Sequence, residues 1–321
     1  KLVEPKKEET IPTHVEEAKE KKEEKVEERY KKIYEAITSI PTGYSWNVDP
    51  YVIPVALPVD LTKYVETKTL RKGQASAKFY KIASLSFSSI TEGTAPSASS
   101  QAVSTVTVTP STYGALQEVT DKDLFEAEID IVGAIERSMA EAARKTLNDL
   151  IIDAVDSADV SNIVYGGDAT DVDSIDSSDT MSFTALMKAK RKILEGHIAC
   201  EVGDLVCVMS PKQYYDLLVD SNVTKILNTE SAPFVKDQLE QLLGIEIVVS
   251  DQVNSADNAG GVTVYHAILF KKNEAVGLAF ERELRIESQR DVAALKTKFM
   301  GSLRAGAKVK VPEACCKIYT A

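Results

Sequence analysis

The sequence predicts an α+β protein in which a mixed α/β region is joined to extended elements that bury little of themselves. Three observations lead to this expectation. The first 40 residues are dominated by charge, residues 65–109 alternate like a long β-ribbon, and residues 127–157 have the apolar spacing of one long helix. Short helix and strand patterns follow over residues 182–288, and strand patterns return near the end of the chain.

The composition is that of a folded protein with an acidic balance. Hydrophobic residues make up 44% of the 321 residues, which is enough for a core in two domains or one elaborate domain. The 38 Lys and Arg residues stand against 49 Asp and Glu residues, a formal net charge of −11. This argues against a dedicated nucleic-acid binder, which usually has a basic surplus. No apolar stretch approaches the roughly 20 residues of a membrane-spanning helix, so no membrane association is expected.

The first 40 residues predict a charged helix that has no core of its own. They contain 10 Lys or Arg and 11 Glu residues, and Thr13 and Glu16 have the spacing of a capping box. A helix with only a thin apolar stripe either stays solvated or docks on another surface, and the stripe thickens towards its end, which favours docking. The stripe consists of Val15, Ala18, Val26, Tyr30, Ile33 and Ile37.

Residues 65–109 predict a ribbon that needs a surface to lie on. Strands are expected at 75–82 and 104–109, where apolar and polar residues alternate. Residues 88–100 between them are rich in Ser, Thr, Ala and Gly. An isolated two-stranded hairpin is only marginally stable in water, and the rest of the chain offers few surfaces to support it. We therefore expect the ribbon to lie on another molecule.

Residues 127–157 predict a helix about 45 Å long, because apolar residues recur there at spacings of three or four without proline. An Asp-rich loop is expected from 153 to 180. The mixed region then predicts helices at 182–195, 211–221 and 235–243 and strands at 204–209, 245–250, 262–270 and 275–280. Late strands at 295–299, 307–311 and 315–319 are expected to return to the sheet and helix formed around 110–157.

The search for catalytic motifs finds no phosphate-binding loop, dinucleotide fingerprint, nucleophile elbow or HExxH sequence, so neither a cofactor nor a catalytic residue is expected. His197, Cys200 and Cys207 fall short of the four ligands of a structural zinc site. All four cysteines are expected to be free thiols. Cys315 and Cys316 lie in an alternating strand, so we expect one thiol to point inward and the other outward.

Two charged clusters have ordinary explanations that we favour. Asp171 to Asp176 begins like a calcium loop, but Asp176 and Ser182 stand where such a loop has its glycine and its bidentate glutamate. A solvated Asp/Ser loop is favoured over a metal site. The second cluster favours a solvated helix face over a phosphate contact, since no aromatic residues lie nearby to stack on bases. It consists of Lys188, Lys190, Arg191 and Lys192.

Several short segments, together with the order of the elements, resemble a known family. The segments are Arg71-Lys72-Gly73, Thr91-Glu92-Gly93, Tyr113-Gly114, Val119-Thr120-Asp121, and Met209-Ser210-Pro211 followed by Tyr214-Tyr215-Asp216-Leu217. In these features residues 50–320 resemble the major capsid proteins of tailed double-stranded DNA viruses, which have the HK97-like fold. The individual segments are short, and the order of the elements is the more specific signal.

The resemblance implies a division of the chain into named parts. Residues 1–64 would be an N-terminal arm with the charged helix, and residues 65–109 the extended β-hairpin called the E-loop. Residues 110–181 would form a P-domain with a long spine helix, and residues 182–288 a mixed α/β A-domain. Residues 289–321 would be P-domain strands that return to that domain.

The resemblance also implies a function. The chain would be a structural protein, not an enzyme, that self-assembles into pentamers and hexamers of an icosahedral shell around double-stranded DNA. Its place would be the virion, with assembly in the host cytoplasm. Further copies of the chain would be its main partners, joined by scaffolding, portal and decoration proteins, and the DNA would be enclosed without sequence-specific binding.

The arm and the ribbon are extended elements that cannot bury much of their surface against themselves. This supports assembly independently of the resemblance. Across neighbours, the arm and the ribbon could each bury on the order of 1,000 Å², the scale of a specific interface. Contacts between subunits are expected at Arg71, Lys72, Thr91, Glu92, Tyr30, Ile33 and Ile37. An encapsulin-like nanocompartment shell of the same fold is the alternative hypothesis. A metal-dependent enzyme built on the Asp cluster is a second alternative, and a β-rich surface adhesin is disfavoured by the free cysteines.

Overall fold

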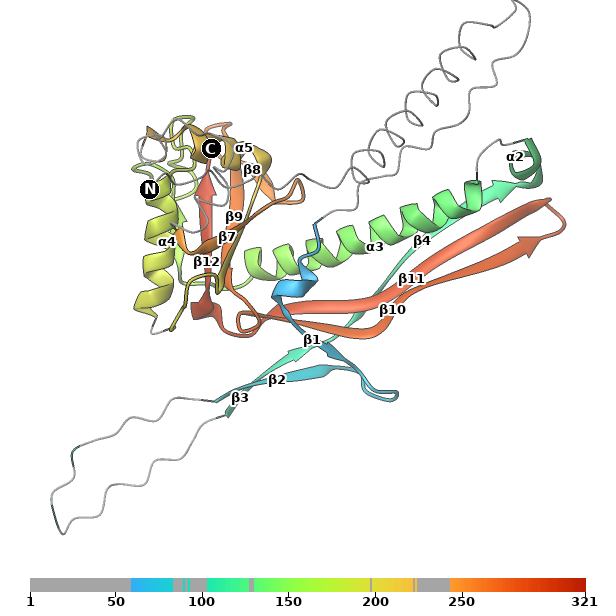
Figure 1. The fold of residues 1–321 in the computed structure, drawn as a ribbon, viewed down its shortest axis with the longest axis horizontal. Helices are drawn as coiled ribbons and strands as arrows, with labels where there is room; N and C mark the ends of the chain where they lie inside the picture. The colour runs from blue at the N-terminus through green and yellow to red at the C-terminus, as the bar shows by residue number, and fades with distance from the viewer. Residues whose placement is uncertain are drawn as a thin grey trace, which may run out of the picture. The chain divides into compact units, whose positions relative to one another are not determined.

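The structure is a computed structural model and describes residues 59–82, 89, 92, 103–126, 130–196, 198–221, 223 and 243–321 (Figure 1). Its helical elements are η1 Thr62–Tyr64, α2 Asp121–Glu126, α3 Ile131–Asp156, α4 Phe183–Glu195, α5 Pro211–Val219 and η3 Pro312–Ala314. Its strands are β1 Glu66–Thr69, β2 Ala77–Ile82, β3 Val103–Val108, β4 Ser111–Thr120, β5 Ile163–Tyr165, β6 Leu205–Met209, β7 Ile245–Val249, β8 Ser255–Asp257, β9 Thr263–Lys271, β10 Val276–Asp291, β11 Lys296–Val309 and β12 Cys315–Thr320.

The first sheet is built around the long hairpin of β10 and β11. Its strands lie in the order β1-β10-β11-β4, with β1 parallel to β10 and the other neighbours antiparallel. Helix α3 lies along this sheet (Figure 1) and buries Ile135 and Met139 against Phe299. The Asp130 side chain caps the helix by accepting the backbone N–H of Gly133 at 3.0 Å. The single long helix predicted at 127–157 is therefore confirmed over its described residues.

The second sheet is covered on both faces. Its strands lie in the order β5-β12-β9-β6-β7, and β8 pairs with β9. Alternate residues of β6 point into two different cores. Val206 and Val208 join the core that contains Ile152 from the end of α3, whereas Cys207 joins the core that contains Leu186 from α4.

The expectation that one of the two adjacent thiols points outward is wrong. Both Cys315 and Cys316 are fully buried, Cys315 in the core that includes the end of α3 and Cys316 in the core that includes α4. The two side chains do point to opposite faces, but alternation along one strand does not reveal that the second face is also covered. Burial raises the pKa of each thiol to about 12, so both stay protonated and unreactive.

Local capping signals explain where the helices of the mixed region begin. The Ser182 hydroxyl accepts the N–H of Ala185 at 3.2 Å and starts α4. Ser210 and Gln213 form a reciprocal capping box at the start of α5. The helices predicted at 182–195 and 211–221 and the strands predicted at 204–209, 245–250 and 262–270 are confirmed to within a few residues. Nearly all of the helix predicted at 235–243 lies outside the described residues.

The two ribbon strands also form as predicted, and β2 pairs antiparallel with β3. The expectation that this ribbon lies on another molecule rather than on its own chain is wrong for its root. Phe79 of β2 is 2% exposed and packs with Leu70, which directly follows β1, and with Ala279 of β10. Gly277 of β10 makes this approach feasible, since a Cβ atom there would lie 2.7 Å from the Phe79 ring. Most of the segment between the two strands lies outside the described residues.

Three expectations about the later strands are wrong. The patterns at 295–299 and 307–311 belong to the single strand β11, whose middle contains Gly301 close to the Met139 side chain of α3. The pattern at 275–280 continues through exposed charged residues as β10, so the boundary expected at 288/289 falls inside a strand. The last strand, β12, joins the second sheet between β5 and β9 rather than the first.

The segment expected to be an Asp-rich loop is more ordered than the sequence indicates. Helix α3 runs on to Asp156, and β5 pairs in parallel with β12. No helix in the part of the chain that the structure describes is both long enough and apolar enough to cross a membrane.

Candidate assembly surfaces

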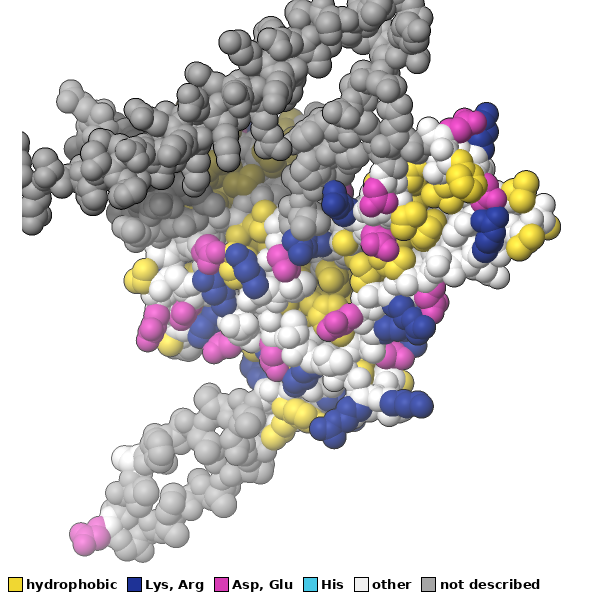
Figure 2. Space-filling model, turned by 45° about the vertical axis from the view of Figure 1, so that its right-hand side comes forward, with side chains coloured by type: hydrophobic (Ala, Val, Ile, Leu, Met, Phe, Trp, Pro, Cys, Tyr) yellow, Lys and Arg dark blue, Asp and Glu magenta, His cyan; other side chains and the backbone are white. Residues whose placement is uncertain are grey.

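The β10–β11 turn and α2 lie at the far end of the first sheet (Figure 1), and both carry exposed hydrophobic side chains. Phe125 is 88% exposed, Val292 73% and Leu295 60%, and we call these three residues the tip cluster. Arg290 joins the two elements by donating two hydrogen bonds to the Asp121 carboxylate at 2.8 and 2.6 Å. Figure 2 shows hydrophobic side chains at this end of the molecule.

Hydrogen bonds tie α2 to the β10–β11 turn, the two elements that carry the tip cluster. The backbone N–H of Asp121 donates to the Leu295 carbonyl at 2.9 Å, and the Arg290 side chain lowers the pKa of the Asp121 carboxyl. Leu295 adopts a φ of 47°, a left-handed conformation that costs a residue with a side chain about 1 kcal/mol. Large apolar residues kept in water by such contacts mark an interaction surface.

The face of the first sheet opposite α3 carries a second exposed apolar pair. Leu116 of β4 lies directly across from Met300 of β11, and both side chains are exposed. Next to them, Lys298 lies 3.6 Å from Glu118 and 3.5 Å from Asp291. Exposed ion pairs such as these contribute little to stability, so this face is a mixed surface with an apolar centre.

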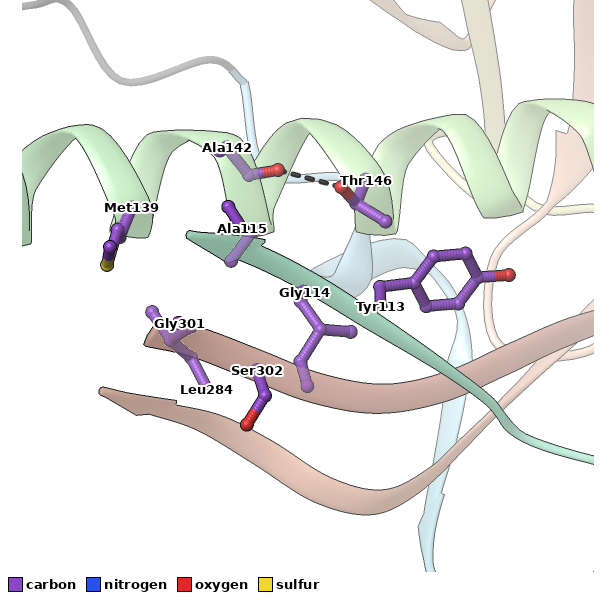
Figure 3. Close-up of a pocket in the computed structure, with 11 residues that line it drawn as sticks. Tyr113, Gly114, Ala115, Met139, Ala142, Thr146, Leu284, Gly301 and Ser302 are labelled. Carbon is purple, nitrogen blue, oxygen red and sulfur yellow. Dashed lines mark hydrogen bonds between the residues drawn. The ribbon is translucent and has the colours of Figure 1, made fainter. Parts of the chain in front are cut away.

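A shallow groove runs between α3 and the edge strand β4 (Figure 3). Gly114 and Ala115 face Ala142 and Thr146, and the Thr146 hydroxyl donates to the Ala142 carbonyl at 2.9 Å. A Cβ atom at Gly114 would lie 2.8 Å from the end of the flexible Met300 side chain, which would have to shift to make room. The groove is lined by apolar and hydroxyl groups without an acid, a base or a thiol, so it is suited to packing rather than to catalysis.

The predicted contact residues Arg71 and Lys72 lie exposed in the turn between β1 and β2. Gly73 makes this turn with a φ of 91°, and the Arg71 N–H donates to the Gln74 side chain at 3.0 Å. Glu92 is also exposed. The other predicted contacts lie outside the described residues: Thr91, Tyr30, Ile33 and Ile37. Contacts between subunits do not show in the structure of one chain, so all seven contact residues stay predictions.

The Asp-rich loop uses its carboxylates to hold its own backbone. Asp171 accepts the N–H of Ser174 at 2.8 Å. Asp176 accepts the Ser178 hydroxyl at 2.6 Å and the Ser178 N–H at 2.7 Å, and these two hydrogen bonds lower the pKa of Asp176. In the described residues no group of three or more His, Cys, Asp or Glu side chains is placed to hold a metal ion. The favoured interpretation, a solvated Asp/Ser loop, agrees with these contacts.

The basic cluster on α4 is bound partly to the protein itself. Lys190 donates to the Leu243 carbonyl at 2.6 Å and Lys192 to the Ile163 carbonyl at 2.5 Å. Arg191 pairs with Glu195 at 2.9 Å. Two of the four cations therefore satisfy carbonyl groups at the ends of neighbouring elements, which fits a structural role better than a phosphate contact.

A partly buried polar junction between α3 and β9 was missed by sequence reasoning. His266 Nδ1 lies 2.9 Å from the Asp156 carboxylate, and Asn254 donates to the same oxygen at 3.0 Å. Burial alone would raise the pKa of Asp156, but the hydrogen bonds from His266 and Asn254 outweigh it and hold that pKa below its usual value. This junction fixes the C-terminal end of α3 to the second sheet. A lone histidine in a strand gives no sequence signal for such a pair.

Comparison with known proteins shows what kind of protein carries these surfaces. A family described as phage capsid protein matches residues 103–318, which is more than half of the chain. The chain belongs to the phage capsid protein family. The match includes the first sheet from β4 onward, α3 and nearly all of the second sheet. Members of this family are shell proteins, in keeping with the expectation that this capsid protein is not an enzyme.

Solved capsid structures share the fold of this capsid protein. The capsid of cyanophage P-SCSP1u matches with 19% identity and a TM-score of 0.65, covering 87% of this chain and 93% of that chain. The capsid of Ralstonia phage GP4 matches with 14% identity and a TM-score of 0.70, covering 88% and 96%. Mycobacterium phage Che8 matches with 17% identity and a TM-score of 0.63, covering 87% and 97%. The expected α+β, HK97-like capsid fold is confirmed.

The fold extends beyond phages. A virus-like particle from Pyrococcus furiosus matches with 14% identity and a TM-score of 0.52, covering 82% of this chain and 93% of that chain. No curated protein sequence matches the chain at a significant level. The family match, rather than the shared fold, therefore identifies this chain as a capsid protein of phage type.

Proposed function

We propose that this capsid protein assembles into the pentamers and hexamers of an icosahedral shell that encloses double-stranded DNA. The tip cluster is the observation that carries the proposal, because a protein that stayed monomeric would gain nothing from holding Phe125 88% exposed. The capsid family and the solved capsids of the same fold support the same conclusion. Assembly takes place in the host cytoplasm with scaffolding and portal proteins, and decoration proteins bind the finished shell.

Within the proposed shell, the parts of the chain take the roles that the resemblance implies. Residues 1–64 form the arm, 65–109 the E-loop and 182–288 the A-domain. Residues 110–181 and 289–321 form the P-domain, with α3 as its spine. Three strands depart from this division: β10 lies in the first sheet from Val276 onward although it begins within the A-domain range, and β5 and β12 lie in the second sheet although they fall within the P-domain ranges.

Neighbouring subunits are held by many modest contacts rather than by one large interface. A subunit bound at one contact is presented to the next at high effective concentration, so weak contacts add up. The contacts proposed for the arm and the E-loop are Arg71, Lys72, Thr91, Glu92, Tyr30, Ile33 and Ile37. The described structure adds the tip cluster, which the sequence alone did not reveal.

Electron microscopy and sedimentation velocity of the purified full chain test the proposal. We expect closed particles of megadalton size, because many copies must join to form a shell. A stable monomer or dimer over a wide concentration range would contradict it. The contents of particles made in the native host separate the viral shell from the nanocompartment alternative, since DNA supports the former and a protein cargo the latter.

The acidic net charge predicts that the shell protein does not bind the enclosed DNA tightly. The net charge of −11 repels phosphate, and specific binding would need a basic groove that reaches base edges. In a gel-shift assay at about 150 mM salt, we expect no complex with duplex DNA at micromolar protein. A complex with sub-micromolar affinity would show that this prediction is wrong.

A further inference from the structure

Charge is distributed very unevenly along this acidic chain. Residues 146–187 contain nine Asp residues and no Lys, Arg or His. Residues 67–91 contain five Lys or Arg residues and no Asp or Glu. A basic surplus of this kind within a protein of net charge −11 calls for a partner of opposite charge.

The basic segment presents three cations that the described part of the protein leaves unpaired. Arg71, Lys72 and Lys78 are exposed at the root of the ribbon, and we call them the root patch. Their neighbours differ, since Lys68 lies 3.5 Å from Glu66 and Lys81 lies 2.9 Å from Glu313. Figure 2 shows Lys and Arg side chains gathered beside the ribbon root.

Lys78 of the root patch also lines a hollow with mixed polar and apolar walls. Leu70 and Ala77 line this hollow together with Lys68, Lys78 and Tyr80. Tyr80 is 66% exposed although the preceding residue of the same strand is buried. Two apolar residues, two lysines and an exposed tyrosine together have the make-up of a protein contact, which combines apolar area with charged groups.

The complementary surface is the loop between β5 and α4. Its exposed carboxylates are in no ion pair among the described residues, and we call them the acidic loop: Asp168, Asp171, Asp173 and Asp176. Asn258 holds this loop by donating to the carbonyl groups of Val172 at 3.3 Å and Ile175 at 2.8 Å. The carboxylates are therefore held in fixed positions before any partner arrives, which lowers the entropic cost of binding.

The two surfaces do not meet within one chain. The N–H of Ala321 donates to the Asp179 carbonyl at 3.0 Å, which places the acidic loop beside the C-terminus. Figure 1 shows the C-terminus at one end of the second sheet and the β1–β2 turn, which carries Arg71 and Lys72, well away from it. Each surface is therefore left for another molecule, and a second copy of the chain offers the matching charge.

We propose that the root patch of one subunit docks on the acidic loop of the next subunit. The contact joins two different surfaces, so it is heterologous, and repeating it generates a ring when the rotation between subunits closes, as it must in pentamers and hexamers. It rests on the proposed function and names one of the interfaces of that shell. Charges arranged in this way select the correct neighbour and speed its approach more than they add affinity, and salt weakens them.

Charge reversal on the full-length protein tests the proposed contact. One variant carries Arg71→Glu and Lys72→Glu, and a second carries Asp168→Lys and Asp173→Lys. We expect each to raise the protein concentration needed for assembly about 10-fold at about 50 mM salt. The variant with all four changes should assemble within about 3-fold of the wild-type concentration. Its root patch is acidic and its loop is basic, so the two surfaces again carry opposite charges.

A control with the same change of charge elsewhere separates the contact from net charge. Arg137→Glu with Lys188→Glu changes two exposed cations that lie outside the root patch, so it should assemble like the wild type. Circular dichroism melting of each unassembled variant confirms that it folds. Normal assembly of either reversed variant, or no recovery in the four-fold variant, would overturn the proposed contact.

Two further outcomes have distinct meanings. If the wild-type chain forms no particles, the proposed function is wrong. If the charge-reversed variants assemble as readily as the wild type, the proposed function still holds and only this contact is wrong. DNA retardation that is lost with Arg71→Glu and Lys72→Glu, while assembly stays normal, would assign the root patch to nucleic acid and contradict the proposal.

Discussion

Replacing Phe79 with alanine should detach the root of the ribbon from the first sheet and prevent assembly. The ring is 2% exposed and packs against Leu70, Val108 and Ala279, and the Lys68 ammonium lies 4.2 Å from its centre. Removing a buried phenylalanine side chain typically costs about 3 kcal/mol or more. Because the ribbon root has few other buried side chains, we expect the loss to fall on β2 and β3. Hydrogen exchange of their amides should be at least about 10-fold faster.

Neighbouring positions supply the controls for this prediction. Tyr80→Ala changes the next residue of the same strand, but that side chain is 66% exposed, so exchange and folding should stay normal. Gly277→Val should reproduce the Phe79→Ala defect from the opposite side, since its Cβ would lie 2.7 Å from the Phe79 ring. The explanation would be wrong if Phe79→Ala and Tyr80→Ala behaved alike in hydrogen exchange.

Local signals in the sequence were sufficient to predict most of the single elements. The Ser182 cap, the Ser210 capping box and the unbroken apolar spacing of α3 are set by residues within one turn or one helix. Alternation likewise identified β2 and β3, and an unbroken apolar run identified β6. These features depend on neighbours in the chain, and the sequence displays neighbours directly.

The features that the sequence did not reveal depend on partners far away in the chain. Cys315 and Cys316 are both buried because different elements cover the two faces of the second sheet, which one strand cannot show. The charged half of β10 looks like a loop by itself, and it becomes a strand through pairing with β11. Phe79 finds support on its own chain only because a glycine stands at position 277 of a distant strand.

The candidate site was harder to predict than the fold. The exposed charges of Arg71 and Lys72 follow from a glycine turn, which the sequence shows. The tip cluster combines residues from α2 and from the β10–β11 turn, and the pairing of Arg290 with Asp121 that joins them spans 169 residues. No local pattern distinguishes an apolar residue held in water from one in a core, so this surface needed the structure.

Polar substitution in the tip cluster should block assembly while leaving the folded subunit intact. Phe125 and Val292 are 88% and 73% exposed in the single chain, so replacing them with serine removes almost no buried contact. If a neighbouring subunit covers Phe125, the loss of its burial weakens that contact by about 2 kcal/mol. This corresponds to about a 30-fold weaker pairwise contact, and the loss recurs at every copy in the shell. We therefore expect Phe125→Ser to yield folded subunits without particles in sedimentation velocity.

Two similarly exposed valines test whether assembly depends on where an exposed apolar side chain lies or only on its hydrophobicity. Val202 is 79% exposed and Val292 is 73% exposed, so the two residues differ mainly in where they lie. Val292→Ser should raise the concentration needed for assembly, whereas Val202→Ser, in the turn before β6, should not. The melting temperature of both unassembled variants should match the wild type, because neither side chain is buried in the subunit. Equal assembly of the two valine variants would mean that the apolar surface at the far end of the first sheet is not where neighbouring subunits meet.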